Sequence, residues 1–259
     1  MNELSDFYRT FAPIEPSKPL MPEISDRAAV AFLCRSLHRE GYDDHLAGHI
    51  TIAAGNGEFY VNPWEIRWDE ITAADVVKMD SDGKHIDGPW NVTPATRVHI
   101  EIHKLRPDTK VIIHNHSKWG TIWANAKRIP PIYDQTSAQT DGDPILVDEY
   151  AQTFDHADAA KAGAEAIGNA KTALLAHHGV LITGDSIQQA YLRAVTLEWR
   201  CRNAYHSEQL GASQPLPPEA AQSVGKRLDD SPCGFPFLWE SAVRREIRDD
   251  PAILNSDSV

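Results

Sequence analysis

The stretch Val111-Ile112-Ile113-His114-Asn115-His116 determines how we interpret this sequence. Its first three residues are apolar and β-branched, which is typical of a short central strand buried on both faces. Residues i and i+2 of a strand point to the same face, so His114 and His116 should leave the end of this strand side by side. Two neutral imidazoles placed in this way form half of a catalytic metal site, and α/β sheets bind ligands at the ends of their strands.

A third ligand is offered by the stretch Ala173-Leu174-Leu175-Ala176-His177-His178-Gly179. Here too an apolar strand ends in histidine, and the glycine that follows allows a tight backbone turn. An H-x-H pair alone also arises on surface turns, so the prediction depends on all three histidines together. We expect His114, His116 and His178 to bind one divalent ion per chain. Imidazole ligands do not select the metal by themselves, and we place zinc ahead of manganese or iron.

A competing pair, His99 and His103, has the i, i+4 spacing at which two helical histidines can share a metal. Their segment lacks the H-E-x-x-H pattern of zinc proteases. We therefore predict that His99 is buried with its hydrogen bonds satisfied and that His103 is solvated.

Strands and helices alternate along the chain, which predicts the α/β class. Residues 1–24 read as an irregular lead with four prolines, 25–210 as the metal-binding domain, and 211–259 as an arm with one short helix near 238–247. We expect helices near 25–41, with Ser25 as N-cap, and near 96–105, 118–126, 157–167 and 186–207. We expect strands near 49–53, 58–61, 76–79, 111–113 and 173–175. A hairpin-like segment is expected at 179–184.

Composition excludes several classes of protein. The 259 residues carry a net charge of −12, which argues against a nucleic-acid partner. There is no apolar run of the roughly 20 residues that a membrane span requires, and the acidic N-terminus lacks the features of a signal peptide. The three cysteines form no C-x-x-C pair. We expect a cytoplasmic protein with neither a membrane nor a nucleic-acid partner.

Taken together, the stretches 99–116 and 174–184 resemble the class II aldolase/adducin family, and 45–51 (His-Leu-Ala-Gly-His-Ile-Thr) resembles its adducin-like branch. The resemblance covers roughly residues 25–210. It implies a three-layer α/β/α fold around a mixed, mainly antiparallel sheet, and a homotetramer with active sites at subunit interfaces. It also implies that His114, His116 and His178 match the family's three metal-binding histidines.

The sequence departs from the sugar-phosphate aldolases of that family at the positions ahead of His99. Those enzymes carry Ser-Ser-Glu where this chain has Thr93-Pro94-Ala95, so the usual catalytic carboxylate is missing. A Gly-Asn turn that helps to bind phosphate is replaced by Gly48-His49. The resemblance therefore implies chemistry on a substrate without a phosphate.

The leading interpretation is a lyase that breaks or forms a C–C bond, of the decarboxylase or aldolase type, next to a carbonyl or carboxylate of a small substrate. An ion held by three histidines keeps open positions and acts as a Lewis acid. Tryptophans in this half of the chain, if they line the pocket, would suit an aromatic substrate. Two alternatives remain open: a non-heme iron oxygenase and a non-catalytic scaffold of the adducin type.

The proton must come from a group other than Ala95. The candidates are His49, His45, Tyr205 from a neighbouring subunit, and water bound to the metal. We prefer His49 because it lies within the Gly-His-Ile-Thr motif, although an ordinary histidine at the start of a strand would look the same. For substrate binding we expect Arg97 to hold a carboxylate with its planar guanidinium, and Thr93 and Trp119 to make further contacts.

Overall fold

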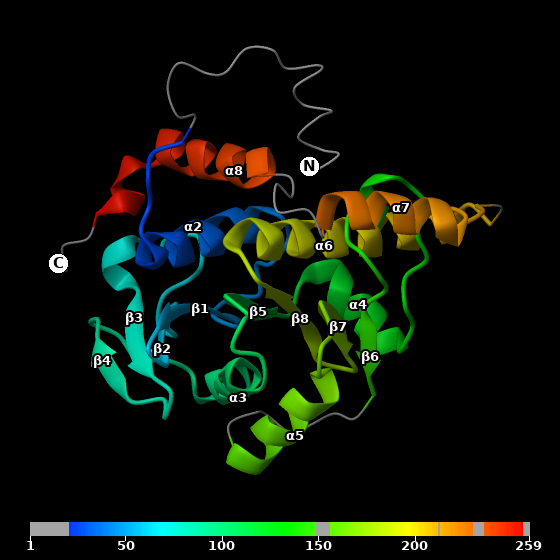
Figure 1. The fold of residues 1–259 in the computed structure, drawn as a ribbon. Helices are drawn as coiled ribbons and strands as arrows, with labels where there is room; N and C mark the ends of the chain where they lie inside the picture. Colours follow the sequence, from blue (N-terminus) through cyan, green and yellow to red (C-terminus); the bar gives the residue numbers. More distant parts are fainter. Residues whose placement is uncertain (1–20, 149–155, 212, 230–235, 256–259) are drawn as a thin grey trace, which may run out of the picture.

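One eight-stranded sheet organises the molecule, in the order β4-β3-β2-β1-β5-β8-β7-β6 (Figure 1). The computed structural model describes residues 21–148, 156–211, 213–229 and 236–255. Every neighbouring pair of strands is antiparallel except β6 and β7, which are parallel. The strands are β1 His49–Gly55, β2 Glu58–Val61, β3 Val77–Asp80, β4 His85–Asp87, β5 Val111–Asn115, β6 Ile145–Val147, β7 Thr172–Leu175 and β8 Gly179–Gly184.

Helices cover both faces of the sheet, which makes the three layers expected from the sequence (Figure 1). On one face lie α2 (Asp26–Arg39), α4 (Lys118–Ala126) and α6 (Ile187–Gln209). On the other lie α3 (Arg97–Leu105) and α5 (Ala157–Ile167). Helix α8 (Pro236–Asp249) packs outside α2 and α6, and α7 (Pro218–Asp229) packs against α6. The predicted α/β fold with a mixed, mainly antiparallel sheet is confirmed.

The side chains of β5 point alternately to the two faces of the sheet, and each face has its own hydrophobic core. Val111 and Ile113 belong to the core under α2, α4 and α6, whereas Ile112 belongs to the core under α3 and α5. By the same alternation His114 lies on the α3 side of the sheet. The β1–β5 register pairs His114 with His49, so a second histidine stands beside it on that side.

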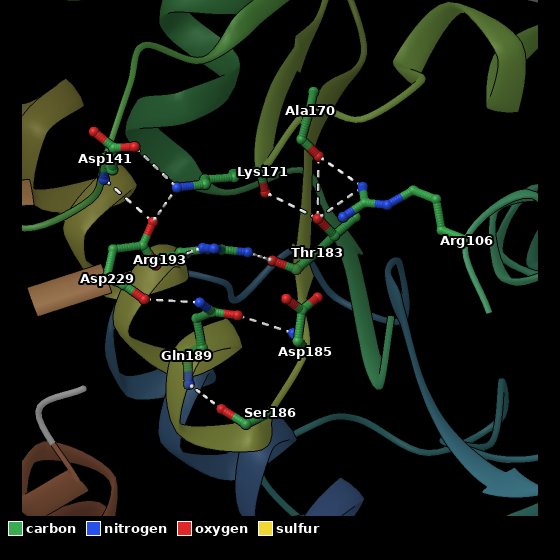
Figure 2. Close-up of polar contacts among 10 residues, drawn as sticks. All are labelled: Arg106, Asp141, Ala170, Lys171, Thr183, Asp185, Ser186, Gln189, Arg193 and Asp229. Carbon is green, nitrogen blue, oxygen red and sulfur yellow. Dashed lines mark hydrogen bonds and ion pairs between the residues drawn. The ribbon is translucent and has the colours of Figure 1, made fainter. Parts of the chain in front are cut away.

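A buried ion-pair network anchors α7 to the rest of the fold (Figure 2). The carboxylate of Asp229, at the end of α7, accepts a hydrogen bond from Arg193 Nε at 2.7 Å and lies 3.2 Å from Lys171 Nζ. Lys171 also pairs with Asp141, and Arg193 donates to the carbonyl of Thr183 in β8. We call Arg193, Asp229, Lys171 and Asp141 the Arg193 cluster. It joins α6 and α7 to the part of the sheet that β7 and β8 form.

The helices of the main domain lie close to their predicted positions, and Ser25 caps α2 by accepting a hydrogen bond from the Ala28 amide. Two strands and one α-helix were not predicted: β4, β6 and α7. The prediction of a hairpin at 179–184 was wrong, because this segment is the single strand β8. Gly184, the last residue of β8, lets the strand pack closely against α6, because a Cβ at this position would lie 2.7 Å from the Ala190 nitrogen.

The C-terminal part carries α8 where a short helix was expected, and α8 buries Trp239 against the main core. Most of the predicted N-terminal lead lies outside the described residues. Within the part of the chain that the structure describes, no helix is both long and apolar enough to span a membrane.

Candidate metal centre

Three histidines converge where β5 ends and where β7 turns into β8. His114, His116 and His178 each offer a ring nitrogen, and these atoms lie within 4.8 Å of one another. His177 adopts a left-handed backbone conformation (φ 57°) in the turn ahead of His178. Gly179 is required there, because a Cβ would lie 2.5 Å from the carbonyl oxygen of Asn115. The tight β5–β8 approach therefore brings the predicted ligands together.

Hydrogen bonds define which nitrogen of two of these rings is available. His114 Nδ1 lies 2.9 Å from the carbonyl oxygen of Val180, and His116 Nδ1 lies 2.7 Å from Asp44 Oδ2. A carbonyl and a carboxylate only accept hydrogen bonds, so each Nδ1 carries the proton and each Nε2 keeps its lone pair. Metal-binding histidines in proteins are held in this way. The residues present therefore fit a divalent ion.

The protonation states also favour metal binding. Burial lowers the pKa of His114 well below its usual value, and the neighbouring His49 lowers it further. Burial likewise lowers the pKa of His178, to about 4. At neutral pH these two rings are uncharged, which is the form that binds a metal.

Two acidic residues hold His116 and the turn that follows it in place. Partial burial acts to raise the pKa of Asp44, but the hydrogen bonds that it accepts from His45 and His116, together with the charges of these rings, lower the pKa below its usual value. Glu198, in α6, accepts from Ser117 Oγ and from the amides of Trp119 and Gly120 at 2.7–2.9 Å. Those donors begin α4, so Glu198 fixes the turn that follows His116.

A pocket of about 200 Å³ opens on the histidines. None of the described residues that line it is a lysine or an arginine, and much of the wall is apolar. Ala95, at the position of the missing carboxylate, is part of that wall. The lining residues are Leu46, Ala47, Gly48, His49, Trp64, Thr93, Ala95, His114, His116 and His178.

Only two of the other predicted site residues line this pocket. His49 and Thr93 line the pocket with the three ligands, and His45 lies beside Asp44 with its side chain 90% exposed. Arg97 lines a separate hollow that also contains Glu101 and Lys104. Trp119 and Tyr205 contact each other, with ring centroids 5.4 Å apart, and neither lines the pocket. The roles predicted for these residues remain predictions.

Sequence reasoning missed Asp44 and Glu198 and misjudged His103. It was half right for His99, which is buried as predicted but whose Nε2 has no hydrogen-bond partner among the described residues. Asp44 follows another aspartate, Asp43, and only the fold distinguishes the one that reaches His116. The prediction that His103 is solvated was wrong, since it is 6% exposed. Its i, i+4 spacing from His99 was the available signal, because it places both rings on one face of α3.

Comparison with known proteins identifies the family. The model of the class II aldolase and adducin N-terminal domain matches residues 28–205. The chain belongs to the class II aldolase and adducin family. This confirms the resemblance found in the sequence.

Relatives within the family differ in their chemistry. The chain is 30% identical over 215 residues to 4-hydroxy-3-prenylphenylpyruvate oxygenase/4-hydroxy-3-prenylbenzoate synthase from Streptomyces roseochromogenus subsp. oscitans, covering 81% of this chain and 76% of that one. It is 29% identical over 229 residues to decarboxylase NovR from Streptomyces niveus, covering 85% and 84%. L-fuculose 1-phosphate aldolase from Glaciozyma antarctica PI12 has the same fold, with a TM-score of 0.76, 22% identity and coverage of 90% and 96%.

Proposed function

We propose that this protein is a metal-dependent carbon–carbon lyase, of the decarboxylase or aldolase type, that acts on a small substrate without a phosphate. The observation that carries the proposal is the convergence of His114, His116 and His178, two of them with their Nδ1 protons already engaged. One divalent ion per chain, with zinc ahead of manganese or iron, would polarise a carbonyl or carboxylate oxygen of the substrate.

The walls of the pocket support the choice of substrate. Phosphate recognition depends on cationic side chains or clustered backbone amides, and no lysine or arginine is among the described lining residues. Trp64 and Leu46 provide apolar surface, which suits a substrate with an aromatic or other planar part. His49, 2% exposed and lining the same pocket, is the residue that we propose contacts the reacting group.

The oxygenase remains the second candidate, because a relative that is 30% identical is named as one. An assay of the chelator-free enzyme distinguishes the two. We expect release of CO₂ or an aldehyde from hydroxy-acids or dihydroxy-aromatic acids without oxygen uptake, and negligible turnover of fuculose, rhamnulose or ribulose phosphates. Substrate-dependent oxygen uptake with iron would establish the oxygenase. Protein that binds no metal would favour a scaffold, and robust turnover of a sugar phosphate would contradict the proposed substrate class.

We further propose that the enzyme is a cytoplasmic homotetramer with active sites at subunit interfaces, as the family resemblance implies. Tyr205 would then act in a neighbouring subunit's site, which accords with its position outside the pocket of its own chain. Light scattering should give four chains per particle. A fully active monomer would contradict this assembly.

A further inference from the structure

A buried asparagine separates two of the proposed metal ligands. Asn115 lies between His114 and His116 in the sequence and has no exposed surface. Successive side chains of a strand point to opposite faces, so Asn115 shares the face of Val111 and Ile113 and points away from His114. It is therefore not placed to bind the same ion, and its buried amide needs another explanation.

The amide of Asn115 holds one wall of the pocket. Its Nδ2 donates to the carbonyl of Ala47 at 3.1 Å, and its Oδ1 has no partner among the described residues. A carbonyl oxygen can only accept, which fixes the orientation of the amide. Gly48 packs against the same side chain with a φ of +96°, and a Cβ on Gly48 would collide with Asn115 Nδ2. Asn115 therefore determines where the chain runs at 47–48.

The preceding residues are bound to the next residue after Asn115. Asp44 Oδ2 accepts a hydrogen bond from His116 Nδ1, and the Asp44 carbonyl accepts one from the Ala47 amide at 2.8 Å. We call residues 44–48 the pocket turn. Two consecutive residues, Asn115 and His116, thus hold the two ends of this turn. Three residues of the turn line the pocket: Leu46, Ala47 and Gly48.

Leu46 is the large side chain that the pocket turn contributes to the pocket. It is 44% exposed, and Trp64, which lines the same pocket, is 50% exposed. Large apolar side chains that remain exposed at a pocket form a surface that a ligand can cover. The indole of Trp64 favours contact with a flat ring. Because no lysine or arginine is among the described lining residues, this surface suits an uncharged aromatic group.

We propose that Leu46 is a specificity-determining residue that packs on an aromatic ring of the substrate, and that Asn115 is a positioning residue that acts through the pocket turn. The preference for a ring rests on the proposed function, because it names the substrate class of that site. The hold of Asn115 on the turn does not depend on the reaction. The substrate class is an aryl-substituted acid or ketone whose carboxylate or carbonyl oxygen the metal binds.

Hydrogen–deuterium exchange of the full-length, zinc-loaded protein measures the hold on the turn. Asn115→Leu keeps a side chain of similar size and loses the donor. Peptides that contain residues 44–48 should exchange about two- to tenfold faster in this variant, as loss of one hydrogen bond predicts. Leu105→Ala is the control, because Leu105 is 55% exposed and does not line the pocket.

Unchanged exchange in the folded Asn115→Leu variant would overturn the positioning role. Its zinc content should equal that of the wild type, and a loss of zinc would show that Asn115 acts on the metal site instead. If Asn115→Leu does not fold, Asn115→Ser takes its place, because the shorter side chain does not reach the Ala47 carbonyl.

Benzoate and acetate, two carboxylic acids that differ by an aromatic ring, test the specificity. In NMR titrations the zinc-loaded wild type should prefer benzoate about tenfold or more, and Leu46→Ala should lower this preference about three- to tenfold. Leu105→Ala should not change it. Asn115→Leu should lower it as well, and the double variant Asn115→Leu/Leu46→Ala should lose no more than Leu46→Ala alone, because both changes act on one contact.

Additive losses in the double variant would overturn the claim that Asn115 acts through Leu46. Equal affinity of the wild type for the two acids would overturn the specificity role, even in a protein that proves to be a lyase. A preference for benzoate that depends on Leu46, in a protein without lyase activity, would uphold the inference and contradict the proposed function. If neither acid binds, the ring preference and the proposed substrate class are both contradicted, and the exchange experiment alone decides the role of Asn115.

Discussion

Two buried polar regions lie in this fold, and they are satisfied to different degrees. In the Arg193 cluster each buried charge has an opposite charge beside it, as Asp229 has in Arg193 and Lys171 (Figure 2). Around the metal pocket, burial lowers the pKa of His49 and of His99 well below the usual value, and both keep nitrogens without partners among the described residues. The first region is complete without a ligand. In the second, the free nitrogens of His49 belong to a residue that lines the pocket, where a ligand would bind, and this distinguishes a structural cluster from a functional one.

The largest expected effect is on stability in the Arg193 cluster. Asp229→Ala leaves Arg193 buried without its carboxylate, which should lower the free energy of unfolding by about 3–5 kcal/mol. Asp148→Ala is the matched control, because its ion pair with Lys127 is exposed and should contribute less than about 1 kcal/mol. Urea denaturation measures both, and equal effects would remove the contrast between a buried cluster and a surface pair. Bound metal should be unchanged in each variant.

The next effect is a pH dependence of stability that the burial of His103 should produce. Burial lowers the pKa of His103 to about 4 in the folded protein, against an ordinary value of 6.5. Between these values the unfolded chain binds a proton that the folded chain does not, so stability falls as the pH drops. Above pH 6.5 His103 is neutral in both states and does not reduce the free energy of unfolding. By pH 4 its protonation in the unfolded chain should have lowered the free energy of unfolding by about 3 kcal/mol.

Denaturation of metal-free protein between pH 7 and 4 measures this dependence, with His103→Phe as the comparison. The substitution keeps a ring beside Phe59, on which His103 stacks with centroids 4.6 Å apart. The variant should lose this part of the pH dependence while the other histidines continue to titrate. Identical curves for the two proteins would show that His103 is not held neutral by the fold.

A smaller effect is expected on metal affinity. Asp44→Ala removes the acceptor that orients His116, and loss of such a partner typically lowers metal affinity 10- to 100-fold. Asp43→Ala removes the same charge one residue earlier, from an exposed side chain, and should leave the affinity nearly unchanged. Competition with a chromophoric chelator measures zinc affinity in both. Equal losses would mean that Asp44 acts only through its charge.

The elements that could be predicted from the sequence are those with local signals. The apolar run at 111–113 and the cap at Ser25 identified β5 and α2, and the H-x-H pattern identified two ligands. The strands β4 and β6 have only three residues each and none that is fully buried, and three residues are too few to show an alternation of apolar and polar side chains. Helix α7 ends at Asp229, whose pairing with Arg193 depends on contacts far apart in the chain.

The supporting residues of the site escaped prediction for the same physical reason. Nothing local separates Asp44 from Asp43, and Glu198 lies 81 positions from Ser117 in the sequence. Their functions depend on which side chains the folded sheet and helices bring within hydrogen-bonding distance. The chemical identity of the ligands was therefore visible in the sequence, whereas the residues that orient them were not.

Metal analysis tests the central claim most directly. Protein purified without chelators should contain about one divalent ion per chain, because His114, His116 and His178 converge with the Nδ1 protons of His114 and His116 already engaged. The double variant His114→Ala/His116→Ala should contain none while remaining folded by circular dichroism. Full retention of the metal in the folded double variant would contradict the assignment of the site.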